Sequence, residues 1–397
     1  MSEHLKRRIG LGLLTAYGVG VMVGAGIYVL VGAVAAESGV WAPVSFLLAG
    51  LIAAPTALSY AEFSTRYPEA AGEAAFVEKG LNSHALALVV GLAIVAAGTV
   101  SAGAVLRGGT GYLAAVLDVP VSAAAVVLGL ALTLVAVVGV LESLALAAVF
   151  TVIEVIGLVL VVYAGSTAEP VAATAALPEG TLLWSGIAAG AVLAFFAFIG
   201  FEDIVNMAEE VDRPERTLPR AILLSLVITT VIYAAVSWAA VRAVPAERLA
   251  ASEQPLVLVW QAGPGGDARF LSAAAVFAAL NGVLAQIVMA SRVLYGLGKR
   301  SAALSVFHHA HPRFGTPALA TALIGALVIA GALALEVAVL AEATSSILLF
   351  VFVLVNAALI AMKRRAPDAV FRVPMAVPVV GLLLALAALL ANIGASL

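Results

Sequence analysis

The chain has 397 residues, of which 63% are hydrophobic and 11% charged, and its formal net charge is −3. The mean hydropathy of +1.14 and many runs of about 20 apolar residues, each long enough to cross a bilayer core of about 30 Å, exclude a soluble globular protein. The absence of cysteine excludes disulfides, thiolate metal sites and cysteine nucleophiles. Because there is no basic, aromatic-rich soluble segment, we expect no nucleic-acid partner.

Eleven apolar segments predict an all-α polytopic membrane protein. They cover residues 10–35, 41–66, 83–106, 121–141, 144–164, 183–208, 219–241, 269–298, 318–335, 340–362 and 374–395. The N-terminal segment has no small-residue cleavage site after a short apolar core. We therefore expect it to be a retained first span and not a signal peptide.

The basic residues predict the orientation of these spans. The chain has 20 Lys and Arg residues. If the N-terminus is cytoplasmic, all but four of them lie on the cytoplasmic side. The four external ones are Arg107, Arg242, Arg248 and Arg269. This asymmetry follows the positive-inside rule, so we expect a multi-pass protein of the inner or plasma membrane with its N-terminus in the cytoplasm.

Two connections between the spans are long enough to have structure of their own. Residues 66–81, on the predicted cytoplasmic side, contain several glutamates and are expected to form a short interfacial helix. Residues 244–268 form the longest external connection, with a weakly helical E-R-L-A-A segment and a terminal G-P-G-G. Long outer loops can act as lids, but we favour a solvated connector here.

The first span is unusually rich in glycine. Residues 18–32 read G-V-G-V-M-V-G-A-G-I-Y-V-L-V-G, with five glycines, and each glycine costs a helix about 1 kcal/mol relative to alanine. A helix break at residues 23–26 is therefore expected. In a membrane, the backbone groups of such a break must line a cavity or bind something. The alternative is that the small residues let another helix pack closely.

The sixth span repeats this feature, because Gly200 lies among aromatic residues in A-F-F-A-F-I-G-F-E. Glycine-interrupted segments five spans apart are typical of two inverted halves with a midplane site. We therefore predict a first repeat at residues 1–165, a second at 183–363 and an additional C-terminal span at 374–397. The halves show no convincing residue-level identity, so this prediction rests on spacing.

Four segments resemble motifs of the amino acid–polyamine–organocation transporter superfamily. They are G-V-M-V-G-A-G-I-Y (20–28), A-L-S-Y-A-E-F-S-T-R-Y-P-E-A-A-G (57–72), the segment from F-I-G-F-E-D to P-R-A-I (198–222), and S-R-V-L-Y-G-L-G-K-R with H-P-R-F-G-T-P (291–300 and 311–317). The family usually has twelve spans, and its core is spans one to ten. The resemblance implies a leucine-transporter-like fold with broken helices one and six, and an amino acid permease that works as a monomer or homodimer.

An amino acid substrate brings a carboxylate and an ammonium group to such a site. Free N–H groups at the start of a half-helix suit a carboxylate, and we expect Gly24, Ala25 and Gly26 to supply them, since missing side chains allow close approach. Free carbonyls near residues 21–22, and near Phe195 and Phe198, suit the ammonium.

The resemblance adds further candidates to this site. Positions that match substrate-contacting or helix-break positions of the family are Met22, Ala25, Gly26, Phe196, Phe198, Ile199 and Gly200. Phe196 would be the outer gate over the pocket, and Gln286 matches a pocket-facing position in the eighth span. For the aromatic residues, plain packing is the alternative.

Glu154 lies midway along the fifth span, in F-T-V-I-E-V-I-G-L-V-L. An ionised acid there would cost about 3 kcal/mol, so we expect a neutral acid that exchanges protons. Relatives in the family often have a lysine or a small residue at this position, where some hold sodium and some a proton-carrying amine. The glutamate keeps a titratable group with reversed charge, and we predict a proton-coupling role. The alternative is a structural acid hydrogen-bonded to a neighbouring helix.

Glu202 matches a glutamate that is thought to sense protons in the family's acid-resistance exchangers. Asp203 follows it, so either acid could titrate, and helix capping or gate closing remains an alternative. Sodium coupling is less expected, because residues 273–290 in the eighth span contain no Ser or Thr, whereas sodium-coupled relatives usually supply hydroxyls there.

The sequence as a whole predicts a secondary active amino acid transporter that works by alternating access. We expect proton coupling and a preference for neutral amino acids, with no cofactor and no metal. The alternatives are an uncoupled exchanger, a carrier of cationic amino acids or polyamines, and a non-transporting amino acid sensor. An enzyme is not expected, because no cluster of His, Asp, Ser or metal ligands recurs on facing spans.

Overall fold

The computed structural model describes residues 9–68, 72–138, 144–171, 184–208, 211–265, 267 and 269–395, without the side chains of 25, 115–116, 144–147, 206 and 393–395. These residues form helices and their connections, and the one β-bridge among them pairs Ile9 with Val211. The α-helices are α1 Leu11–Ser38, α2 Ala42–Arg66, α3 Gly72–Leu81, α4 His84–Leu117, α5 Val121–Val138, α6 Leu144–Thr167, α8 Trp184–Phe196, α9 Pro214–Ala243, α10 Ala246–Ala250, α11 Pro255–Ala262, α12 Arg269–Arg300, α13 Ala318–Ala334, α14 Val337–Arg365 and α15 Ala376–Ala395. The 3₁₀ helices are η1 Gly39–Trp41, η2 Glu202–Met207 and η3 Ala302–Phe307.

Within these residues, seven helical stretches are long and apolar enough to cross a membrane, and four shorter apolar helices accompany them. The all-α polytopic fold is thus confirmed, and each predicted apolar segment contains an α-helix. The number of crossings and their direction stay predictions. Large apolar side chains on the outer faces of α5 and α6, such as Val127, Leu134 and Val152, are exposed, as expected for surfaces that contact lipid.

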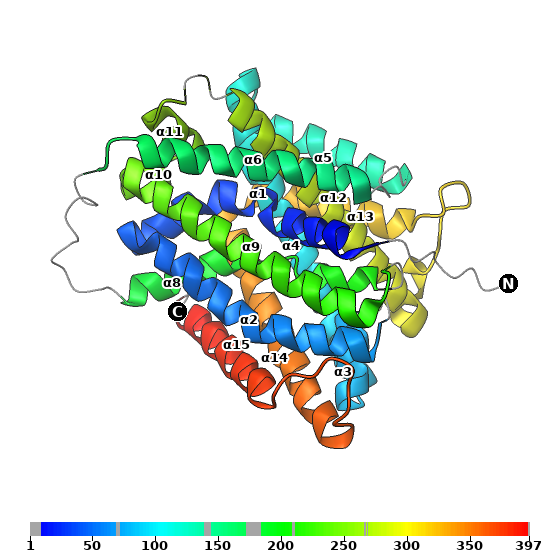
Figure 1. Cartoon of the computed structure of the whole chain (residues 1–397). Coiled ribbons are helices and arrows are strands. Elements are labelled where there is room, and N and C mark those ends of the chain that lie inside the picture. Colours follow the sequence, from blue (N-terminus) through cyan, green and yellow to red (C-terminus); the bar gives the residue numbers. More distant parts are fainter. Residues whose placement is uncertain are drawn as a thin grey trace.

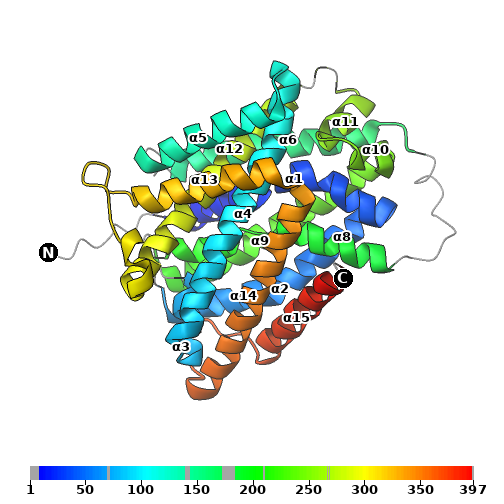
Figure 2. The same ribbon diagram turned by 180° about the vertical axis from the view of Figure 1, so that it is seen from behind.

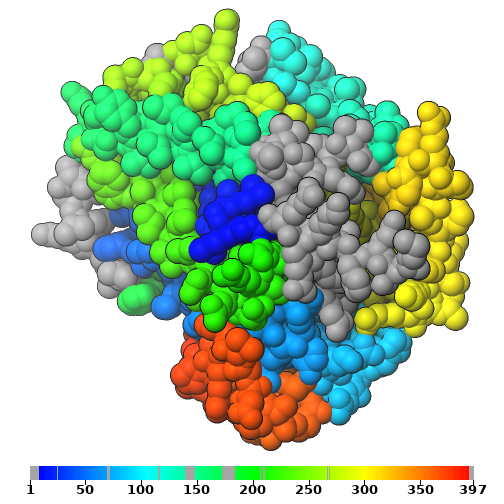
Figure 3. Space-filling view, turned by 45° about the vertical axis from the view of Figure 1, so that its right-hand side comes forward, coloured from blue at the N-terminus to red at the C-terminus, as the bar shows by residue number. Residues whose placement is uncertain are grey.

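The first helix lies against several others near the centre of the molecule. α1 packs against α8, α9, α6 and α12, while α2 packs against α9 and α15 (Figure 1). From behind, α4 runs beside α12 and α14 (Figure 2). The N-terminal part of α1 reaches the molecular surface between α6 and α9 (Figure 3). This arrangement surrounds the middle of α1 with protein.

The third apolar segment forms a longer helix than the sequence predicts. α4 continues to Leu117, and Asp118 ends it with a left-handed φ of 52°. The small residues after Arg107 do not end the helix, because they allow close packing: a Cβ on Gly108 or Gly109 would collide with side chains of α1 and α12. Arg107 therefore lies inside α4, where its Nη1 donates to the Ala332 carbonyl at 2.9 Å.

The two long connections are both folded. The expected helix in residues 66–81 is present as α3. The expectation of a solvated connector at residues 244–268 is wrong, because α10 and α11 pack onto α1, α6 and α9, with Leu249 and Leu256 fully buried. Burial of these leucines attaches the connection to the neighbouring helices through apolar contacts.

Candidate substrate and proton site

The backbone of α1 leaves helical geometry at Gly24, with φ −3° and ψ −165°. This residue lies in the segment where the sequence predicts a break. A Cβ on Gly24 would have the Gly282 Cα of α12 as its nearest neighbour, at 4.0 Å. The irregular backbone of α1 therefore lies close to the backbone of α12, with Gly24 opposite Gly282.

The sixth apolar segment is interrupted in the same region. α8 ends at Phe196, residues 197–201 form turns, and η2 begins at Glu202. Gly200 has φ +125°, a conformation that residues with a Cβ rarely adopt. The irregular backbone thus contains Ala197, Phe198, Ile199 and Gly200.

The two interruptions are in direct contact. A Cβ on Gly200 would lie 2.7 Å from Val21 Cγ1 and 3.1 Å from Met22 N, and a Cβ on Gly26 would lie 3.2 Å from Ala197 Cα. These glycines are therefore needed for the close approach of two backbones as well as for local conformation. The structure brings Met22, Gly24, Gly26 and the turn at 197–200 together, while the side chain of Ala25 lies outside the described residues.

We expect Gly200→Ala to lower stability by about 2–4 kcal/mol. The methyl group adds backbone strain of about 1–3 kcal/mol and meets Val21 and the Met22 backbone too closely. The measurement is the free energy of unfolding of the purified protein in detergent. Gly315→Ala is the control, because Gly315 also has a positive φ, +71°, but no atom within 4 Å of a Cβ. Equal losses in both variants would show that packing between the interruptions contributes nothing.

The predicted aromatic residues are buried around this contact. The Phe195 ring meets Phe352 of α14 edge-on at 5.7 Å, and the Phe198 ring meets Tyr233 of α9 edge-on at 5.1 Å. Phe196 is buried as well. These contacts describe apolar packing, and the role of Phe196 as a gate stays a prediction.

A small cavity next to the turn is lined by acids. Ile199, Glu202 and Asp203 face Gln286 of α12 there, together with residues of α4 and α14, and the cavity has space for about one water molecule. The Gly200 N–H donates to Glu202 Oε2 at 3.0 Å, and Gln286 Nε2 donates to Asp203 Oδ2 at 3.1 Å. Within the described residues, the buried Gln286 Oε1 has no hydrogen-bond partner.

A third acid lies near the same group. Glu73 belongs to α3, outside the spanning helices, and it is buried. Burial, reinforced by the charge of Asp203 and partly offset by hydrogen bonds, raises the pKa of Glu73 to about 8. The sequence prediction named Glu202 and Asp203 but missed Glu73. The other groups that act on its carboxyl, Asp203 and Tyr60, lie far from it in the sequence.

Glu154 lies in α6, apart from this cavity. Its side chain is fully buried, and its backbone carbonyl accepts a hydrogen bond from Tyr28 Oη of α1 at 2.9 Å. Neither carboxyl oxygen is within hydrogen-bond geometry of a described partner, although Asn281 of α12 is a polar neighbour. The alternative to a proton-coupling role is that Glu154 is a structural acid hydrogen-bonded to a neighbouring helix. Asn281 is the side chain that could form this bond.

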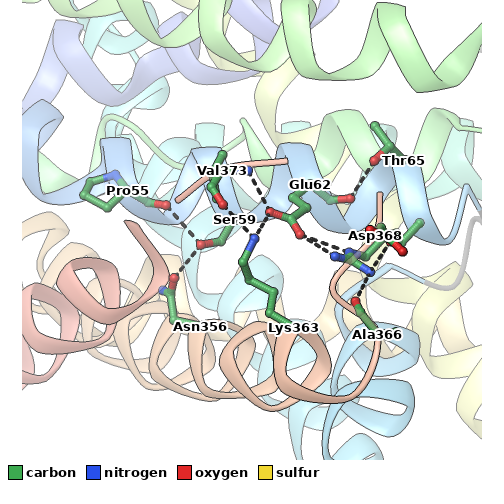
Figure 4. A network of polar contacts seen from close by, with 10 residues as sticks. Pro55, Ser59, Glu62, Thr65, Asn356, Lys363, Ala366, Asp368 and Val373 are labelled. Atoms are coloured by element: carbon green, nitrogen blue, oxygen red, sulfur yellow. Dashed lines mark hydrogen bonds and ion pairs between the residues drawn. The ribbon is translucent and has the colours of Figure 1, made fainter. Parts of the chain in front are cut away.

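A second buried acid escaped the sequence prediction altogether. Glu62 of α2 accepts from Arg66 Nη2 at 2.6 Å through Oε1, and from Lys363 Nζ of α14 at 2.7 Å through Oε2 (Figure 4). Val373 N–H, in the connection before α15, donates to the same Oε2 at 2.9 Å. The Glu62 side chain is fully buried, and 3% of the Lys363 side chain is exposed. This ion pair is therefore shielded from water.

Further bonds extend this network to the connection between α14 and α15. Arg66 Nη1 donates to the carbonyls of Ala366 and Asp368, and Lys363 Nζ donates to the Val373 carbonyl (Figure 4). Each cation therefore binds a carboxylate oxygen and at least one backbone oxygen. The network ties α2, α14 and the chain leading to α15 together at one end of the molecule.

The helical architecture of the described residues and the apolar outer faces define a polytopic membrane protein. The chain belongs to the amino acid permease family, because a family model with the description "Amino acid permease" matches residues 9–396. The resemblance found in the four sequence motifs is thereby confirmed.

Three curated relatives illustrate the range of this family. The branched-chain amino acid permease BcaP of Bacillus subtilis (strain 168) is 28% identical, over 92% of this chain and 83% of that protein. The vacuolar cationic amino acid transporter 4 of Arabidopsis thaliana is 30% identical over 82% of this chain, which spans only 58% of that longer protein. The methylthioribose transporter of Bacillus subtilis (strain 168) is 28% identical, over 85% of this chain and 77% of that protein.

Proposed function

We propose that the protein is a secondary active transporter that carries amino acids across a cell membrane by alternating access. Proton coupling and a preference for neutral amino acids complete the proposal. The observation that supports it most is the contact of α1 with the turn at 197–200. Val21, Met22 and Gly26, on either side of the irregular backbone at Gly24, make this contact, in a chain of the amino acid permease family.

The substrate would be held mainly by backbone groups at this contact. N–H groups of Gly24, Ala25 and Gly26 would receive the carboxylate, because helix N-termini favour anions. Carbonyls of the preceding turn, at Met22, and of the interrupted sixth segment would receive the ammonium. Phe195, Phe196, Phe198 and Ile199 supply apolar walls, which suit an uncharged side chain.

Proton coupling is assigned to Glu154. Its carboxyl group is fully buried, with Asn281 of α12 as its polar neighbour. A carboxyl group in such surroundings is tolerated as the neutral acid, and it can release its proton when water or substrate reaches it. Glu202 is the second candidate, because it lines the cavity beside the turn.

A carrier of cationic amino acids is the second candidate function. The cavity brings together Glu202, Asp203 and Gln286 Oε1, and this amide oxygen has no hydrogen-bond partner among the described residues. Ionised carboxylates in such a group would favour an ammonium or guanidinium side chain. The similarity to a cationic amino acid transporter of Arabidopsis thaliana agrees with this alternative.

Uptake into proteoliposomes tests these functions together. We expect labelled leucine and alanine to accumulate when the outside is more acidic than the inside, and arginine and putrescine to be excluded. Accumulation of arginine in place of leucine would establish the cationic carrier. Equal filling without accumulation would establish an exchanger or uncoupled carrier, and binding without uptake would establish a sensor. Protein-free vesicles under the same gradient are the control.

A further inference from the structure

Tyr233 of α9 reaches the point where the two interrupted segments meet. Its hydroxyl oxygen lies 2.6 Å from the Met22 carbonyl oxygen of α1 and 2.7 Å from the Ala197 carbonyl oxygen of the turn after α8. Its side chain is fully buried. One side chain from a third, regular helix thus contacts both irregular backbones.

The position of this hydroxyl is fixed by the packing of its ring. The Tyr233 ring meets Phe46 of α2 at 5.7 Å and Phe198 at 5.1 Å, both edge-on. Rings held on two sides leave the side chain little rotational freedom. The hydroxyl is therefore a fixed donor between two carbonyls, and it is not a mobile group.

The two carbonyls have no equivalent in regular helices. In an unbroken helix, the carbonyl of residue 22 would accept from the N–H of residue 26, and the irregular backbone at Gly24 interrupts that pattern. A phenol has one proton, so the two carbonyls share one donor. Each carbonyl oxygen has two lone pairs, and the hydroxyl uses at most one of each.

We propose that Tyr233 is the positioning residue for the α-ammonium group of the substrate. Its hydroxyl holds the Met22 and Ala197 carbonyls as a pair, one from each interrupted segment, and the ammonium would bind the second lone pair of each oxygen. The inference rests on the proposed transport of amino acids. It adds that recognition of the amino group depends on α9, a helix without any interruption.

Tyr233→Phe isolates this role, because it removes only the hydroxyl and keeps the ring against Phe46 and Phe198. The readout is the ratio between the inhibition constant of 4-methylpentanoate, which is leucine without its amino group, and the KM of leucine. Both ligands are measured on the same preparation, so the ratio does not depend on the amount of folded protein. We expect it to fall about tenfold, with the maximal rate of leucine uptake changed much less.

Tyr112→Phe is the matched control. Tyr112 of α4 is also fully buried, and its hydroxyl also donates to a carbonyl of α1, that of Tyr28, at 2.6 Å. That carbonyl lies in the regular part of the helix. We expect the control to lose stability without a change in the ratio.

The outcomes separate this inference from the proposed function. A Tyr233→Phe ratio equal to that of the wild type overturns the inference, and so does an equal fall in Tyr112→Phe. If the wild type takes up no amino acid, the proposed function itself fails. Should Tyr233→Phe not fold, Tyr233→Met, which also lacks a donor but fills the space flexibly, is measured in the same way.

Discussion

Replacing Glu62 by glutamine will destabilise the protein by about 3–5 kcal/mol, the cost of removing one partner from a buried ion pair. The carboxylate receives Arg66, Lys363 and the Val373 N–H. A glutamine keeps the shape of the side chain, but its amide nitrogen would face one of these donors. Two cations that are almost fully buried would also lose their counter-charge.

The free energy of unfolding in detergent measures this effect. A series of variants can then be ranked by how much stability each one loses. Lys363→Met should cost less than Glu62→Gln, because Glu62 keeps Arg66 as a partner. Arg364→Met is the control, since Arg364 is adjacent in the sequence but exposed, and surface changes usually cost less than about 0.5 kcal/mol. If Glu62→Gln costs no more than Arg364→Met, the network is not a structural tie.

A double variant, Glu62→Leu with Lys363→Met, sharpens the interpretation. Buried ion pairs replaced as a unit by apolar residues are often neutral for stability. We expect the double variant to be more stable than the sum of its single changes predicts, although Arg66 still lacks its carboxylate. Simple additivity would mean that Glu62 and Lys363 act independently.

The sequence predicted the parts of the fold that depend on periodic or local signals. Apolar runs located the helices, and the glycine at 200 marked a turn whose positive φ the structure shows. Gly108 and Gly109, by contrast, serve helix packing inside α4. A glycine gives the same local signal in both cases, and only its neighbours in space distinguish a break from a contact.

The residues that were missed depend on partners far away in the sequence. Glu62 and Lys363 are 301 positions apart, and each alone resembles an ordinary charge at the end of a helix. Tyr233 resembles any buried aromatic residue, and only its distances to the Met22 and Ala197 carbonyls set it apart. No pattern within one segment carries such information.

Glu154→Gln will abolish the accumulation of leucine driven by a proton gradient, so that the ratio of internal to external leucine falls to about one. Glutamine has nearly the same shape but cannot bind or release a proton. The carboxyl group it replaces is fully buried, with Asn281 as its polar neighbour. We expect exchange of labelled for unlabelled leucine, which needs no net proton movement, to continue within several-fold of the wild-type rate.

Parallel measurement of Glu202→Gln decides between the two candidate acids. Glu202 accepts the Gly200 N–H, and the amide oxygen of a glutamine can accept the same N–H, so the turn and the exchange of leucine should be retained. Loss of accumulation with exchange retained, seen in Glu154→Gln alone, identifies Glu154 as the proton carrier. Full proton-driven accumulation by Glu154→Gln would reduce this residue to a structural acid, and coupling would then have to pass through the acids of the cavity, Glu202 and Asp203.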